Sequence, residues 1–159
     1  MTGLGLRVRA MGMGIPRLAG VFIDADNIGP RHAEMALCEV RRDASLRVGS
    51  LRAYKDWGQE ARDSRGALAY RRLGVEQVQV DRVSRKNSSD IRMVVDIMES
   101  LLVDDMRHFV LITSDSDFRH VLHHVRKRGG TSVVYHCGCA PGLEAATDRS
   151  VRIEGRLNM

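Results

Sequence analysis

The chain of 159 residues has a formal net charge of +5, a pI of about 9.6 and 43% hydrophobic residues. These values are typical of one globular domain with a sizeable core, and the basic excess favours a polyanionic partner such as nucleic acid. Only 4% of the residues are aromatic, which argues against an extended base-stacking platform, and no apolar run approaches the roughly 18–20 residues that span a membrane.

The first half of the chain predicts three strands separated by helices. Residues 1–18 are rich in Gly, Met and Arg without an acid, and we expect them to form a loose N-terminal tail. A strand at residues 18–23 ends in Asp24-Ala25-Asp26-Asn27. Pro30 suits the first position of a helix that runs to about residue 42. Strands are predicted at 46–54 and 75–80, with a polar helix before Gly74.

The second half continues the alternation after a basic loop at residues 82–87. Ser88-Ser89-Asp90 is predicted to cap a helix that runs to about residue 103. Its expected core-facing residues are Ile91, Val94, Val95, Met98, Leu101 and Leu102. A buried strand at residues 109–112 runs directly into Thr113-Ser114-Asp115-Ser116-Asp117 and another helix. Strands are expected at 131–135 and, at the edge, 151–153.

Alternating strands and helices predict an α/β fold, with a mostly parallel sheet covered by helices on both faces. Acids follow several strands, and the carboxyl ends of parallel strands share one edge. Any one acid is explained by helix capping, for example Asp90 as an N-cap or Ser114 and Asp117 as a capping box. Several carboxylates gathered together repel one another, and a divalent cation removes that repulsion. Their hard oxygen ligands suit Mg²⁺ or Mn²⁺.

Three motifs in order carry a resemblance to a known family. They are FIDADN (residues 22–27), KNSSDIRMVVD (86–96) and LITSDSDF (111–118). From about residue 20 to 153 the chain resembles the NYN family of the PIN-like nuclease superfamily. The resemblance implies a three-layer PIN-like or Rossmann-like sandwich with strand order 3-2-1-4-5. It also implies a nuclease domain at residues 19–154, followed by a short tail at 155–159.

The resemblance also implies the site of a metal-dependent ribonuclease. Its implied metal ligands are Asp24, Asp90, Asp115 and Asp117, with Asn27 and Ser114 as neighbours that orient water or ligand carboxylates. Two further acids are uncertain. Asp26 alternates away from Asp24 along the strand and could instead cap the following helix. Asp96 lies about 120° round the helix from Asp90 and is expected nearly opposite its apolar face.

The basic loop stands beside the predicted acid edge. Arg82, Arg85 and Lys86 could hold the phosphates that flank a scissile bond, or they could form an ordinary solvated loop. Trp57 could stack on a base, although a single tryptophan is more often packed against the protein.

The leading hypothesis is a Mg²⁺- or Mn²⁺-dependent ribonuclease that cleaves single-stranded or looped RNA through metal-activated water. One alternative is a haloacid dehalogenase-like phosphatase, with Asp24 and Asp26 as nucleophile and general acid. Another is a non-catalytic RNA-binding regulatory protein. A homodimer is compatible with the sequence. Three cysteines (Cys38, Cys137 and Cys139) without a signal peptide favour a reducing compartment, and we expect a cytoplasmic protein.

Overall fold

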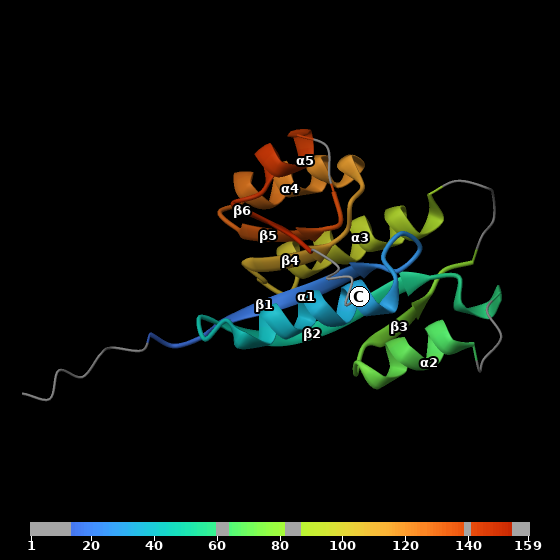
Figure 1. The fold of residues 1–159 in the computed structure, drawn as a ribbon. Helices are drawn as coiled ribbons and strands as arrows, with labels where there is room; N and C mark the ends of the chain where they lie inside the picture. The colour runs from blue at the N-terminus through green and yellow to red at the C-terminus, as the bar shows by residue number, and fades with distance from the viewer. Residues whose placement is uncertain (1–13, 60–63, 82–86, 139–140, 154–159) are drawn as a thin grey trace, which may run out of the picture.

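The computed structural model describes residues 14–59, 64–81, 87–138 and 141–153. Strands and helices alternate along the chain (Figure 1). In chain order the elements are β1 (Arg17–Asp24), α1 (Pro30–Arg42), β2 (Leu46–Lys55), the 3-10 helix η1 (Trp57–Gln59), α2 (Arg65–Arg72), β3 (Glu76–Gln79), α3 (Ser88–Leu102), β4 (His108–Ile112), the 3-10 helix η2 (Ser116–Phe118), α4 (Arg119–Lys127), β5 (Thr131–His136), α5 (Pro141–Ala146) and β6 (Arg149–Arg152).

The strands form one all-parallel sheet in the order β3-β2-β1-β4-β5-β6, so the predicted order 3-2-1-4-5 is confirmed. The predicted edge strand is also present, as β6 paired with β5. Strand β1 begins two residues before the predicted domain start at 19, because Arg17 already pairs with Leu46 of β2. The carboxyl ends of β1, β2 and β4 therefore lie next to one another at one edge of the sheet.

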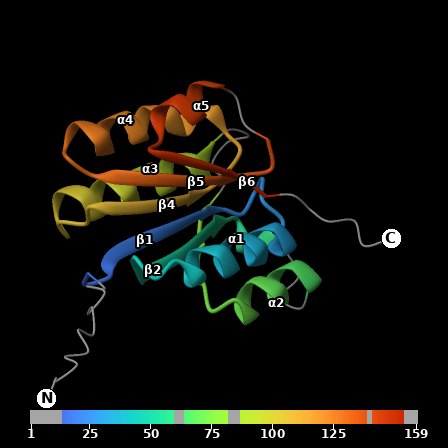
Figure 2. The same ribbon diagram turned by 60° about the vertical axis from the view of Figure 1, so that its left-hand side comes forward.

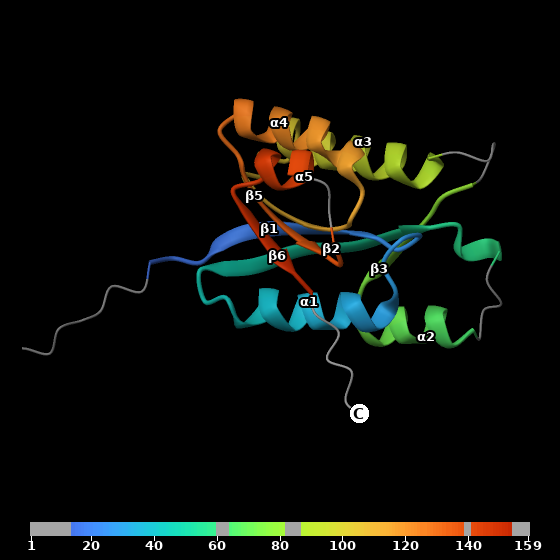
Figure 3. The ribbon, with the colours of Figure 1, turned by 45° about the horizontal axis from the view of Figure 1, so that its top comes forward.

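Helices cover the sheet on both faces (Figures 2 and 3). Helices α1 and α2 lie on one face, and α3, α4 and α5 lie on the other. Alternate residues of β1 serve the two cores, with Ile23 packed on the α1 side and Phe22 on the α3 side. Because side chains alternate along a strand, Asp24 faces the same side as Phe22. The first acid of the predicted site thus points toward the layer that contains α3.

Helix α3 faces the sheet with a different side from the one predicted. Three of its predicted core residues, Ile91, Val95 and Leu102, have exposed fractions of 63%, 53% and 53%. The buried residues are Ser89, Met93, Asp96, Ile97, Ser100 and Leu101. Asp96, expected opposite the apolar face, is therefore on the buried face. Of the other predicted core residues, Leu101 is buried and Val94 and Met98 are partly buried. The prediction was wrong for Ile91, Val95 and Leu102 because polar contacts to the sheet set the rotation of the helix about its axis.

None of the helices within the described ranges is long and apolar enough to cross a membrane.

Candidate active site at the carboxyl edge of the sheet

Asp24, the last residue of β1, is buried at the carboxyl edge with only 1% of its surface exposed. Its Oδ2 atom accepts hydrogen bonds from Asn27 Nδ2 and Thr113 Oγ1, both at 2.9 Å. Its Oδ1 atom is buried and has no hydrogen-bond partner among the residues that the structure describes. A buried carboxylate oxygen without a partner is unfavourable, because folding removes its hydrogen bonds to water and no hydrogen bond within the protein replaces them.

Burial raises the pKa of Asp24, and the hydrogen bonds from Asn27 and Thr113 oppose that rise. The negative charges of Asp26 and Asp115 raise the pKa further. The folded protein thus holds this carboxylate where its charge is unfavourable, and a cation beside Oδ1 would remove the penalty.

The loop after β1 reaches across to the start of α3. The Oδ2 atom of Asp26 accepts a hydrogen bond from Ser89 Oγ. Asp26 is not the N-cap of α1, because that position is Gly29, which makes no side-chain capping bond. The contact with Ser89 ties the first turn of α3 to the end of β1, next to Asp90.

Asp90 is the third residue of α3, so the prediction that it caps the helix is wrong; the N-cap is Asn87, in the left-handed region with φ 57°. Burial raises the pKa of Asp90 to about 6, and four other carboxylates add to the rise. These four, in decreasing order of effect, are Asp24, Asp115, Asp26 and Asp117. The fold therefore brings acids from three separate segments within electrostatic range of one another, as the strand-end pattern predicted.

The segment after β4 supplies the remaining acids. Thr113 Oγ1, which donates to Asp24, also accepts from the backbone N–H of Asp115 at 3.1 Å. The Asp115 carboxylate caps η2 by accepting from the Asp117 N–H at 2.9 Å. The predicted capping box is wrong, because Ser114 Oγ instead accepts from the Cys137 N–H beyond β5 at 3.0 Å. Asp117 is exposed, and its Oδ1 lies 3.5 Å from Arg119 Nη1.

Within the described ranges, no three His, Cys, Asp or Glu side chains converge closely enough to enclose a metal ion on their own. The acids of the edge nevertheless fit a hard cation in their chemistry. All are oxygen donors, and one of them presents the buried, unpartnered Oδ1 atom of Asp24. Mg²⁺ keeps several of its waters and is usually held by one or two carboxylates together with substrate phosphates. One or two of the carboxylates at this edge would be enough to hold such an ion.

The profile of one protein family, described as the NYN domain, matches residues 18–154. The chain belongs to the NYN domain family. This match confirms the resemblance carried by the three acidic motifs, and the family belongs to the PIN-like nucleases. No curated protein shows significant similarity to the chain.

One solved structure shares the fold of this chain. A protein of unknown function from Vibrio parahaemolyticus, VPA0982, superimposes with a TM-score of 0.70 at 18% identity, covering 87% of this chain and 94% of that one. GenD2 from gentamicin A biosynthesis, solved in complex with NAD, gives a TM-score of 0.40 at 17% identity. The match to GenD2 covers 87% of this chain but 34% of that one.

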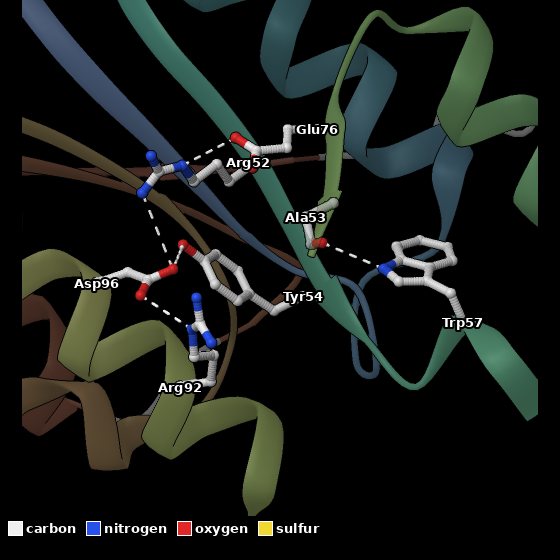
Figure 4. Close-up of polar contacts among 7 residues, drawn as sticks. All are labelled: Arg52, Ala53, Tyr54, Trp57, Glu76, Arg92 and Asp96. Atoms are coloured by element: carbon white, nitrogen blue, oxygen red, sulfur yellow. Dashed lines mark hydrogen bonds and ion pairs between the residues drawn. The ribbon is translucent and has the colours of Figure 1, made fainter. Parts of the chain in front are cut away.

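Asp96 of this NYN domain takes part in a separate network on the inner face of α3 (Figure 4). Its carboxylate accepts from the Tyr54 hydroxyl at 2.9 Å and from Arg92 Nε at 3.0 Å, and Arg52 Nη1 lies 3.9 Å away. Arg52 in turn pairs with Glu76 of β3 at 3.0 Å. Both oxygens of Asp96 therefore already contact the arginine side chains or the Tyr54 hydroxyl. Asp96 joins α3 to β2 and is not part of the acid edge.

Two polar contacts fix the rotation of α3. Ser89, bonded to Asp26, and Asp96, bonded to Tyr54, are seven residues apart, which is about two helical turns and places them on one face. Turning Ile91 and Val95 inward would break both contacts and leave the carboxylate of Asp96 without its partners. The same turn would expose Met93, Ile97 and Leu101, so the apolar areas covered and uncovered would roughly offset one another, and the two polar contacts decide the rotation.

Among the residues that hold the acid edge and Asp96 in position, Thr113, Ser89 and Tyr54 were not predicted as such. Strand register offers a signal for two of them. Ile23 pairs with Ile112, so Thr113 follows beside Asp24, and Tyr54 pairs with Asp24 directly. Ser89 has no comparable signal, since its partner Asp26 is 63 residues away in the sequence.

The predicted RNA contacts Arg82, Arg85 and Lys86 lie outside the described residues. Trp57 packs against the protein, as is usual for a single tryptophan. Its ring meets Tyr70 edge-on at a centroid distance of 5.4 Å, and its Nε1 donates to the Ala53 carbonyl at 3.3 Å (Figure 4).

We expect Asp90→Asn to stabilise the metal-free protein at neutral pH but not in acid. The pKa of Asp90 is raised from 3.8 to about 6 in the folded protein, so the native state retains this proton to higher pH than the unfolded chain. The contribution of Asp90 to stability therefore falls as pH rises from about 4 to about 6 and stays low above that. After allowance for solvent screening, the variant should gain on the order of 1 kcal/mol near pH 7.

Urea denaturation in EDTA at several pH values measures this difference. The matched control is Asp104→Asn, which removes an exposed acid from the segment after α3. A gap between wild type and Asp90→Asn that does not change with pH would contradict the proposed crowding of charge around Asp90.

Proposed function

We propose that this NYN domain is a metal-dependent ribonuclease that cleaves single-stranded or looped RNA with Mg²⁺ or Mn²⁺. The observation that carries the proposal is the buried Oδ1 atom of Asp24, which lacks a partner among the described residues. Four neighbouring carboxylates raise the pKa of Asp90, which supports a cluster of acids at the same site. Membership in a nuclease family and the net charge of +5 support a nucleic-acid substrate.

The residues that would hold the ion are Asp24, Asp90, Asp115 and Asp117. When bound, the ion lowers the pKa of the attacking water and neutralises charge on the leaving oxygen. The chain's own contribution is to hold these acids in position. Asn27 and Thr113 both bond Oδ2 of Asp24, which fixes the carboxylate and leaves Oδ1 available.

Asp115 is held in a different way from Asp24. Its carboxylate accepts from the Asp117 N–H, and its own N–H donates to the hydroxyl that holds Asp24. The same threonine therefore sets the positions of two proposed ligands that come from neighbouring strands. Positioned groups of this kind reduce the reorganisation that cation binding requires.

The phosphatase alternative requires Asp24 to attack phosphorus as a nucleophile. Asp24 is only 1% exposed, and Asp26, its proposed acid partner, is engaged by Ser89. Both features fit a metal ligand and its support better than a nucleophile and a general acid. No feature of the described residues favours a non-catalytic RNA-binding role over catalysis.

The proposal predicts cleavage of labelled single-stranded RNA in Mn²⁺, no cleavage in EDTA, and a loss of activity in Asp115→Asn. Asn replaces Asp equally well as an N-cap, so a residue that only caps η2 would tolerate the change. Turnover of p-nitrophenyl phosphate without RNA cleavage would select the phosphatase. Tight RNA binding without cleavage in Mn²⁺ would select the regulatory alternative.

A further inference from the structure

Helix α3 is apolar on two opposite sides. Its inner side contributes Met93, Ile97 and Leu101 to the core beside β1 and β2. Its outer side carries a second apolar stripe, formed by Ile91, Val95, Met98 and Leu102, of which Met98 is half-buried and the other three are exposed. At 100° per residue these four side chains lie within about 60° of one another around the helix axis.

A helix that is apolar all round is normally covered on all sides, whereas a surface helix is apolar on one face only. The orientation of the outer stripe is fixed, because Ser89 and Asp96 anchor the opposite face of α3 through hydrogen bonds to Asp26 and Tyr54. The acid site does not use the stripe. An apolar surface held outward in this way is typical of a protein–protein interface.

We propose that the outer face of α3 pairs with the same face of a second copy of this chain, with the two helices antiparallel. The spacing of the stripe is 4-3-4, and it is symmetric about the midpoint between positions 96 and 97. A twofold axis at that midpoint sets Ile91 of one copy against Leu102 of the other, and Val95 against Met98. A C₂ interface requires this kind of self-complementarity.

Charge favours the same arrangement. Arg92 and Glu99 lie on one flank of the stripe, about 20° apart around the helix. In the antiparallel pair this flank meets itself, and Arg92 of one copy falls roughly 3 Å along the axis from Glu99 of the other. The side chain of Arg92 is 54% exposed although its Nε atom bonds Asp96, and Glu99 is exposed. In a parallel pair this flank would instead face the opposite flank of the partner helix, so Arg92 and Glu99 of the two copies would not meet.

The interface is small, so we expect a dimer that dissociates in the micromolar range rather than an obligate one. The proposal concerns the face of α3 opposite Ser89 and Asp96, and it does not depend on nuclease activity. A dimer without cleavage, or cleavage without a dimer, would separate the two proposals.

Sedimentation equilibrium across the micromolar range tests the proposal. Wild type should be in monomer–dimer equilibrium, and Val95→Asp and Leu102→Asp should each be monomeric with an unchanged circular dichroism spectrum. The matched control is Ile15→Asp, which makes the same type of change at an exposed apolar residue outside the stripe and should leave the dimer intact. Monomeric wild type throughout the range, or an intact dimer in both stripe variants, would overturn the proposal.

Cysteine cross-linking tests the orientation in a background in which Cys38, Cys137 and Cys139 are replaced by Ser. Positions 91 and 102 are about 16 Å apart along one helix, too far for a disulfide within one chain. Ile91→Cys with Leu102→Cys should give a covalent dimer on oxidation, and each single variant should give none. Cross-linking by the single variants alone would indicate a parallel pair and overturn the antiparallel arrangement.

Discussion

Asp24→Asn is expected to lower RNA cleavage in Mn²⁺ by at least about a hundredfold while the fold is retained. The variant keeps an oxygen that can accept from Asn27 and Thr113, so the hydrogen bonds that hold this position survive. It loses the charge of the buried carboxylate, which is the property that a cation requires. Cleavage rates with labelled RNA, together with thermal unfolding, separate the two effects.

The stability of this variant should move in the opposite direction from its activity. Burial raises the pKa of Asp24, so its ionised form is unfavourable in the folded protein at neutral pH, and a neutral side chain relieves that penalty. Asp104→Asn serves as the control for removing one negative charge at an exposed site. Normal cleavage by Asp24→Asn would show that the charge at this position has no part in catalysis.

Asp96→Ala is expected to be the most destabilising of the changes considered, by about 3–5 kcal/mol. It removes a buried carboxylate and leaves the Tyr54 hydroxyl and Arg92 without this acceptor, while Arg52 keeps its pair with Glu76. Tyr54→Phe removes one hydrogen bond from the same carboxylate and should cost about 1–3 kcal/mol. Denaturation midpoints in urea measure both values.

Glu76→Ala is the matched control for this network. It breaks an exposed ion pair with Arg52, and such pairs contribute at most about 1 kcal/mol.

If Asp96 sets the rotation of α3, Tyr54→Phe should also weaken Mn²⁺ binding, because Asp90 lies on the same helix. A core variant of similar stability loss on the opposite face of the sheet, such as Leu37→Ala, should bind Mn²⁺ normally. Equal Mn²⁺ binding in Tyr54→Phe and wild type would limit Asp96 to a role in stability.

The sheet and the position of the acid edge could be predicted because both follow from local patterns. The central strands β1 and β4 contain short buried apolar runs, and a parallel topology places the carboxyl ends of all strands at the same edge. Asp24 ends β1, and Asp115 and Asp117 lie in the short segment after β4, so their approximate place needed no knowledge of distant contacts. Asp90 follows a loop and not a strand, and its place depends on the Ser89–Asp26 contact.

The rotation of α3 could not be predicted because its sequence offers two apolar stripes of similar strength. Hydrophobic periodicity favours the stripe with Ile91, Val95 and Leu102, and the structure turns that stripe outward. The choice depends on hydrogen bonds between residues 63 and 42 positions apart in sequence, which no local window contains. The capping pattern after β4 failed for a similar reason, since Ser114 bonds Cys137 on the neighbouring strand end.

The most direct test of the proposed metal site is a calorimetric titration of Mn²⁺ into metal-free wild-type protein and into Asp24→Asn, without RNA. The wild type is expected to bind Mn²⁺ with a measurable heat and to gain thermal stability as a result, because a ligand that binds only the folded state stabilises it. Asp24→Asn should show a greatly reduced heat and a smaller gain. Indistinguishable titrations, or a wild type that binds no Mn²⁺, would contradict the assignment of these acids as a metal site.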